Sequence, residues 1–348
     1  TSLAPSMIGR TKFPSAAGMP GTLSPDGLQS FLAYGAVQEP FTLVRGLQSL
    51  PPGHTLRCQG NSHDLHAFWL PPPTATAPPA NALPSIREKV HAALQHAVAS
   101  QRVADVKLGT FLSGGIDSAA IVALLRQATN DDLYSFTLAF ADKRFDERHF
   151  AALSAQANAF THHELELGGD EVKANLPAAI NAFDQPSIDG LNTWFVAKAA
   201  RSAGLKVALS GVGGDELFVG YQAFRNPRRL HRWQNFLRAM PTRATAALAA
   251  RSDSEKLRKL ARLASYPYPA TFLTRQILSP ELRQSLLCPD FLAAGAGTSD
   301  WEQRCFAQLA GRADDDLINA ISFWELRSYM LSTLLRDSDQ MSMAHGLE

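Results

Sequence analysis

The sequence predicts an α/β protein: a parallel sheet with helices on both faces, followed by a mostly helical C-terminal half. Two observations carry this prediction. From Ser85 to about residue 211, short apolar segments alternate with longer segments of helical periodicity. Such alternation is typical of parallel strands joined by crossover helices. After about Pro227 the periodicity becomes almost wholly helical.

Residues 1–84 contain fewer elements. A short helix is expected in LSPDGLQSFLAYGAV, where Ser24 can cap the helix and Pro25 can occupy its first turn. Short strand-like pieces follow and end at HAFW. Residues 71–84 (PPPTATAPPANALP) are rich in proline and alanine, so we expect an extended linker there.

The elements after the linker follow from the same periodicities. Helices are expected in IREKVHAALQHAVASQ, DSAAIVALLRQAT, ERHFAALSAQAN and TWFVAKAARSAG, and strands in KLGTFL, LYSFTLAF, THHELEL and KVALSG. Further helices are expected in RRLHRWQNFLRAM, SEKLRKLARLAS and LINAISFWELRSYMLSTLLRDSDQMSM.

Composition excludes several classes of protein. The chain has 348 residues, enough for about two domains, and its 33 Lys and Arg balance 32 Asp and Glu to a net charge of +1. This balance provides no excess of positive charge that would attract nucleic acid or an anionic membrane surface. The three cysteines form no CxxC pair, and no apolar run approaches the roughly 20 residues of a membrane span. We therefore expect a cytoplasmic protein in a reducing compartment.

The segment FLSGGIDSA lies where a strand is expected to end and a helix to begin. Ligands of open parallel sheets bind at this edge. Gly114 and Gly115 let the backbone approach a ligand, Ser113 and Ser118 offer hydroxyl groups, and the first helical amides are expected to point outward, so that the turn forms an anion cradle. Asp117 fits a phosphate site if a divalent cation, most simply Mg²⁺, bridges the carboxylate and the phosphate. The alternative is a simple helix start in which Ser113 or Asp117 caps backbone amides.

A second loop repeats this pattern in KVALSGVGGDELFVGY. It carries Ser210, Gly211, Gly213 and Gly214, and then the acids Asp215 and Glu216. Because the carboxyl ends of parallel strands share one edge, the two loops are expected to converge on one nucleotide, with Asp117 and Asp215 as metal ligands. The alternative is a glycine turn with solvated acids, which suits Glu216 better than Asp215.

SGGIDSA, SGVGGDELFVGY and LLRDSDQMSMAHGLE together resemble the synthetase domain of glutamine-dependent asparagine synthetases, within the ATP pyrophosphatases. The resemblance implies a PP-loop fold over 85–348, with 1–70 similar to the end of the glutaminase domain. It implies that ATP activates a small carboxylate, aspartate or a related acid, and that glutamine-derived ammonia attacks the acyl-adenylate. Asp117 and Asp215 match the magnesium-binding, catalytic acids. Four positions match contacts to the ATP base, sugar or phosphates: Leu112, Leu138, Ser210 and Gly211. A homodimer is an assembly compatible with this family.

The sequence departs from that family at four points. Val212 stands where an acidic residue is common, and Ile188 or its neighbour falls where an arginine clamps aspartate. The family's catalytic lysine lies downstream of Glu348, which suggests a truncated synthetase domain, and its cysteine nucleophile lies before Thr1. Three hypotheses remain: an asparagine synthetase acting on aspartate, a paralogue that amidates a sugar acid or secondary metabolite, and a catalytically silent nucleotide-binding interaction domain.

Other polar and aromatic residues are expected to be structural. His162 and His163 are neighbours on a strand and point to opposite faces, so they do not share a metal site. Asp337 and Asp339 are expected to be solvated or paired with Arg336. The aromatic residues at helical spacing, Phe323, Trp324 and Tyr329, are expected in the core.

Overall fold

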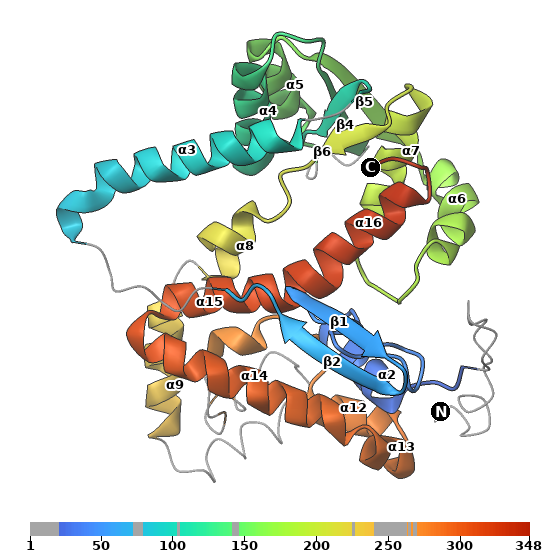
Figure 1. The fold of residues 1–348 in the computed structure, drawn as a ribbon, viewed down its shortest axis with the longest axis vertical. Coiled ribbons are helices and arrows are strands. Elements are labelled where there is room, and N and C mark those ends of the chain that lie inside the picture. Colours follow the sequence, from blue (N-terminus) through green and yellow to red (C-terminus); the bar gives the residue numbers. More distant parts are fainter. Residues whose placement is uncertain are drawn as a thin grey trace. The chain divides into compact units, whose positions relative to one another are not determined.

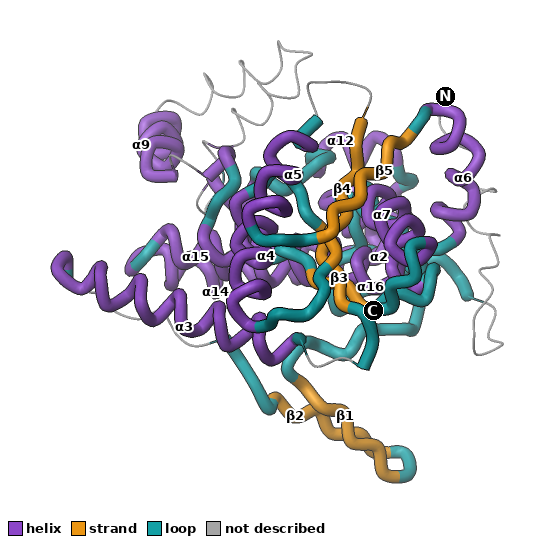
Figure 2. The backbone as a smooth tube through the Cα atoms, turned by 90° about the horizontal axis from the view of Figure 1, so that it is seen from above, coloured by secondary structure: helices purple, strands orange, loops and turns teal. Residues whose placement is uncertain are grey.

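The structure is a computed structural model that describes residues 21–71, 79–102, 105–140, 146–224, 227–239, 263, 266 and 270–348. The chain forms two compact units (Figure 1, Figure 2). The sheet unit contains Ala77–Asp184, Asp189–Asp215 and Thr333–Glu348. The helical unit contains Thr1–Thr76, Gln185–Ile188 and Glu216–Ser332.

A four-stranded parallel sheet forms the centre of the sheet unit. Its strands are β3 (Leu108–Phe111), β4 (Tyr134–Phe140), β5 (Thr161–Leu167) and β6 (Val207–Leu209), in the order β5-β4-β3-β6. Thr110 of β3 lies opposite Leu209 of β6, so these two strands end side by side. The chain after β3 and the chain after β6 therefore leave the sheet at neighbouring points.

Helices cover both faces of this sheet, as Figure 1 and Figure 2 show. On one face lie α3 (Leu83–Gln101), α4 (Ile116–Ala128) and α5 (Arg148–Ala157), which bury Val98, Val122 and Leu125 with the β3 side chains. On the other face lie α6 (Gly169–Asn181), α7 (Leu191–Ser202) and α16 (Arg336–Met343), with Phe136 and Val196 in the core. The predicted parallel sheet with helices on both faces is confirmed.

The helical unit contains one hairpin, β1 (His54–Gln59) and β2 (Ser62–Ala67), and helices from both ends of the chain. Its described helices are α2 (Pro25–Tyr34), α9 (Pro227–Arg238), α12 (Pro280–Leu286), α13 (Pro289–Ala294), α14 (Ala296–Asp315) and α15 (Leu317–Glu325). Tyr34, Trp301 and Trp324 form its aromatic centre with edge-to-face and tilted ring contacts. The mostly helical C-terminal half is thus confirmed.

Several local expectations can be compared with the structure. Ser24 caps α2 and accepts a hydrogen bond from the Gly27 amide, 3.1 Å away, as predicted. Helix α3 begins at Leu83, inside the segment expected to be a linker. The long C-terminal helical segment is interrupted by π-helical hydrogen bonding over Leu326–Leu335, and the helix expected in SEKLRKLARLAS lies largely outside the described residues.

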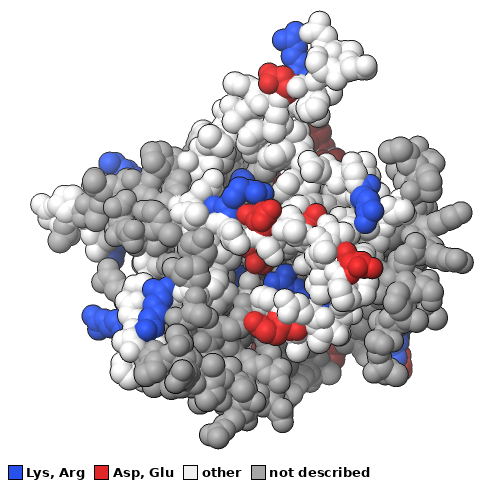
Figure 3. Space-filling model, turned by 90° about the horizontal axis from the view of Figure 1, so that it is seen from below, with Lys and Arg blue, Asp and Glu red and all other residues white. Residues whose placement is uncertain are grey.

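The described residues can also be compared with the features of membrane-spanning helices and of strongly charged surfaces. None of these helices is both long enough and apolar enough to cross a membrane. On the face drawn in Figure 3, acidic and basic side chains of the described residues lie among one another and form no broad field of one sign.

Arg126 fixes the far ends of α4 and α5. Its guanidinium donates to the backbone carbonyls of Asn158 (2.8 Å), Ala159 (3.0 Å), Asp131 (3.1 Å) and Thr129 (3.3 Å).

We expect Arg126→Lys to lower the free energy of unfolding by about 2 kcal/mol, because one ammonium group cannot donate to all four of these carbonyls. Urea denaturation measures the change. Arg87→Lys, on the exposed side of α3, is the control and should change stability by less than about 0.5 kcal/mol; equal stability of both variants would contradict this role.

Candidate functional site

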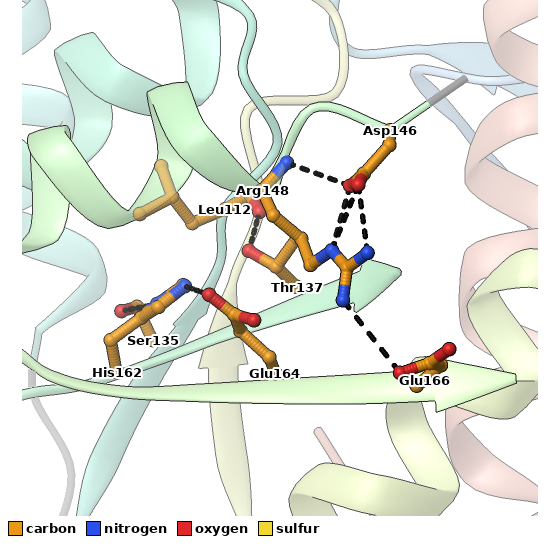
Figure 4. Close-up of polar contacts among 8 residues, drawn as sticks. All are labelled: Leu112, Ser135, Thr137, Asp146, Arg148, His162, Glu164 and Glu166. Atoms are coloured by element: carbon orange, nitrogen blue, oxygen red, sulfur yellow. Dashed lines mark hydrogen bonds and ion pairs between the residues drawn. The ribbon is translucent and has the colours of Figure 1, made fainter. Parts of the chain in front are cut away.

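The first glycine-rich loop is held at the carboxyl end of β3. The Leu112 amide donates to the Phe136 carbonyl (2.9 Å), and the Thr137 hydroxyl donates to the Leu112 carbonyl, a contact drawn in Figure 4. The side chain of Leu112 is buried in the core on the α4 face. Leu112 can therefore meet a ligand at the edge only through its backbone.

The second loop, which follows β6, touches the first. A Cβ atom added to Gly211 would lie 2.8 Å from the Ser118 amide nitrogen. One added to Gly214 would lie 2.4 Å from Cγ of Asp117 and 2.5 Å from its Oδ2. Only residues without a side chain allow this approach, so the glycines of the second loop bring its backbone against the carboxylate of the first.

Asp117 lies in the first turn of α4, and Asp215 in α8 (Gly214–Phe218). Partial burial, and then the nearby Asp215 carboxylate, raise the pKa of Asp117. Two acids from separate loops therefore act on each other at one edge of the sheet. Among the described residues, no group of three or more His, Cys, Asp and Glu side chains gathers in a metal-binding arrangement.

Side chains accept the hydrogen bonds of the amides in the first loop. The Ser113 amide donates to Ser118 Oγ (3.2 Å), the Gly115 amide to Ser113 Oγ (3.2 Å), and the Gly114 amide to Glu147 Oε2 (3.0 Å). Helix α4 starts after Gly115 and has no side-chain cap on its first turn. Ser113, Ser118 and the more distant Glu147 thus accept the hydrogen bonds of these three amides, whereas the first turn of the helix keeps the uncapped amides that the sequence predicts.

The remaining predicted ligand contacts lie around these loops. Leu138, in β4, packs with the core on the α7 face. Ser210 is exposed, and its Oγ accepts a hydrogen bond from the Val212 amide (3.3 Å). Val212 is 40% exposed, so an apolar side chain reaches solvent where the family commonly has an acid.

Two acids do not lie where the sequence suggests. Glu216 is 1% exposed rather than solvated, and it accepts a hydrogen bond from the Tyr221 hydroxyl within the helical unit. Burial, and then this hydrogen bond, raise the pKa of Tyr221. Asp337 is also buried and not solvated. Burial excludes the alternative of a solvated Glu216, and for Asp337 it excludes solvation but not the pairing with Arg336. The sequence could not distinguish these interpretations, because an exposed acid and a buried acid have the same pattern.

The histidine prediction fits the structure. His162 Nδ1 lies 2.8 Å from Ser135 Oγ on one face of the sheet (Figure 4), and the His163 ring stacks on Phe136 with centroids 4.9 Å apart on the other. A cavity of about 340 Å³ lies beside His163. It is lined by residues of β4, β5, α6 and α7 and by none of the residues of the two loops.

Sequence reasoning missed Glu147. It occupies the N-cap position of α5 without a capping side-chain hydrogen bond, and its carboxylate reaches the first loop instead. The available signal was the position of the expected helix ERHFAALSAQAN directly after a strand. The chain leaves every parallel strand at the carboxyl edge of the sheet, so the start of this helix lies at the same edge as the first loop.

The chain has relatives of known family. A family model described as asparagine synthase matches residues 89–348. The chain belongs to the asparagine synthase family. It is thus a member of a family of ATP-dependent ligases that form amides.

Individual relatives give the extent of the similarity. Asparagine synthetase (glutamine-hydrolyzing) 1 of Bacillus subtilis is 26% identical over 331 residues, covering 93% of this chain and 50% of that protein. A Mycobacterium tuberculosis protein provisionally named asparagine synthetase (glutamine-hydrolyzing) is 31% identical over 329 residues, covering 92% and 49%. Amidase chry2 of Gibberella zeae is 29% identical over 231 residues, covering 57% and 34%. The chain spans about half the length of the two synthetases.

Gly214→Ala tests the contact between the loops. The new Cβ would displace the Asp117 carboxylate, which can rotate away, so we expect a small change in melting temperature but about tenfold weaker binding of ATP with Mg²⁺. Isothermal titration calorimetry measures the affinity. Gly168→Ala is the matched control, because its Cβ meets no atom within 4 Å. Full affinity in Gly214→Ala would show that this approach does not shape the site.

Asp117→Asn tests the electrostatics of the metal-free protein. The pKa of Asp117 is higher in the folded state than the unfolded value of about 3.9, so its ionisation opposes folding as pH rises through the folded pKa. We expect Asp117→Asn to raise the melting temperature at pH 7 by on the order of 1–2 °C, and the gain to disappear near pH 4.

Differential scanning calorimetry in a chelating buffer measures both melting temperatures. Glu164→Gln, at an exposed position on β5, controls for the loss of one charge. A lower melting temperature for Asp117→Asn at pH 7 would contradict the repulsion between the two acids.

Proposed function

We propose that this chain is the synthetase part of an ATP-dependent amidotransferase of the glutamine-hydrolysing asparagine synthetase type. It adenylates a carboxylate substrate, releases pyrophosphate, and lets ammonia attack the acyl-adenylate. The observation that supports this proposal best is the contact of the Asp117 carboxylate with the Gly214 backbone, beside Asp215, at the carboxyl edge of a parallel sheet. Ammonia derives from glutamine, as the names of the synthetase relatives indicate for those proteins.

Asp117 and Asp215 are the proposed magnesium ligands. Carboxylate oxygens are preferred by this cation, and the Asp215 carboxylate, after burial, raises the pKa of Asp117, so a cation between the two acids would be favourable. Because no third metal-binding side chain gathers with these acids among the described residues, phosphate oxygens and water would complete the coordination of the cation. When bound, magnesium would neutralise charge on the departing pyrophosphate.

The other loop residues hold the nucleotide in this proposal. The backbone and hydroxyl groups of Ser113, Gly114, Gly115 and Ser118 bind phosphates together with Ser210 and Gly211, and the uncapped first turn of α4 adds a favourable dipole. Leu112, through its backbone, and Leu138 contact the base, the ribose or the phosphates. No protein nucleophile is required, because the substrate carboxylate attacks the α-phosphate itself.

The acceptor acid is the second question, and a specific observation favours an acid other than aspartate. Val212 and Ile188 are both exposed apolar residues where the family resemblance leads us to expect an acid and an arginine. A site without the arginine lacks the bidentate partner of a substrate carboxylate. A paralogue that amidates a sugar acid or secondary metabolite is therefore the second candidate.

Exchange of labelled pyrophosphate into ATP, measured with a panel of carboxylates, tests the proposal. Exchange with aspartate supports the asparagine synthetase activity, and exchange with another acid alone supports the second candidate. We expect Asp117→Asn and Asp215→Asn each to reduce exchange by about 100-fold or more, because charge on the leaving group is no longer neutralised. ATP binding without exchange for any acid would refute the enzyme and leave a nucleotide-binding interaction domain.

A further inference from the structure

The Gly114 amide, one of the donors proposed to bind phosphate, is already occupied by an anionic side chain. It donates to Glu147 Oε2 at 3.0 Å. The approach is close along the backbone as well: a Cβ on Gly114 would lie 2.9 Å from Cβ of Glu147 and 3.2 Å from Cβ of Phe150. The start of α5 therefore lies directly against the loop.

The backbone of Glu147 is fixed, but its carboxylate can move. Its carbonyl accepts hydrogen bonds from the Phe150 amide (3.1 Å) and the Ala151 amide (3.2 Å) in the first turn of α5. The residue as a whole is exposed to solvent. Rotation about side-chain bonds is then sufficient to move the carboxylate from the loop into water, without any change in α5.

The neighbouring cation does not hold Glu147. The Arg148 guanidinium donates to both oxygens of Asp146 at 2.8–3.0 Å, and its remaining nitrogen lies 3.7 Å from Glu166 (Figure 4). The contact of Glu147 with the loop is therefore a bond between a carboxylate and a neutral amide. One N–H donates to one such anion at a time, so a phosphate oxygen and this carboxylate exclude each other.

We propose that Glu147 is an internal competitor of the nucleotide: its carboxylate occupies the Gly114 amide in the free protein and leaves when a phosphate oxygen takes its place. This inference rests on the proposed nucleotide site and adds a determinant of its affinity. Binding of a nucleotide must break the contact between Gly114 and Glu147, and it brings a second anion close to the Glu147 carboxylate. Glu147 therefore weakens the binding of polyphosphates, and it holds the Gly114 amide when they are absent.

Binding of MgATP and of inorganic pyrophosphate to the full chain tests the inference. We expect Glu147→Ala to bind both ligands about tenfold more tightly, the size of one charge-assisted hydrogen bond, and Glu147→Gln to fall between this variant and the natural protein. Glu166→Gln is the control, because it removes a carboxylate that contacts Arg148 rather than the loop, and its affinities should change less than twofold. Unchanged or weaker binding by Glu147→Ala would overturn the inference.

A second measurement keeps this inference separate from the proposed function. The amide resonance of Gly114, followed by NMR in the ligand-free protein, should shift in Glu147→Gln and not in Glu166→Gln. Tighter pyrophosphate binding by Glu147→Ala without any binding of ATP would refute the proposed function and sustain the competitor role. Failure of both ligands to bind any variant, or an unshifted Gly114 resonance, would refute the competitor.

Discussion

The site depends on the contact between the Asp117 carboxylate and the backbone of Gly214. Parallel pairing of β3 with β6 brings the two loops to neighbouring points, and the missing side chain at Gly214 lets the second loop reach the acid. Burial and the adjacent Asp215 make ionisation of Asp117 unfavourable. In the proposed site, a cation with its bound phosphates would offset this unfavourable ionisation.

The rest of the sheet unit keeps this contact in register. Hydrogen bonds between Leu112 and β4 fix where the first loop leaves the sheet, and Arg126 ties the opposite end of α4 to the ends of neighbouring elements. An acid on the first turn of a helix can be placed accurately only if both ends of that helix are held. The interactions of Leu112 and Arg126 thus both stabilise the sheet unit and fix the position of Asp117, although neither contact would be recognised as functional from the sequence.

The sequence was sufficient for the features that depend on local pattern. Strand-length apolar segments predicted the sheet, and the glycines and acids after two of them predicted the two loops at its edge, because all parallel strands end on one side. The sequence was insufficient to predict which acidic side chains are buried and which residues they contact. Glu216 and Asp337 are only 1% and 2% exposed, and Glu147 meets Gly114, which precedes it by 33 positions in the sequence. Periodicity carries no information about such pairs.

In the proposed function, activation of the carboxylate and choice of the acceptor acid depend on different residues. The glycines, serines and acids expected around the triphosphate are all present, while the departures from the family pattern fall at Val212 and Ile188, which are 40% and 67% exposed. The expected acid and arginine carry opposite charges, so losing both leaves the net charge unchanged but removes two polar partners. The two departures therefore change the polar groups available for recognition and not the electrostatic balance.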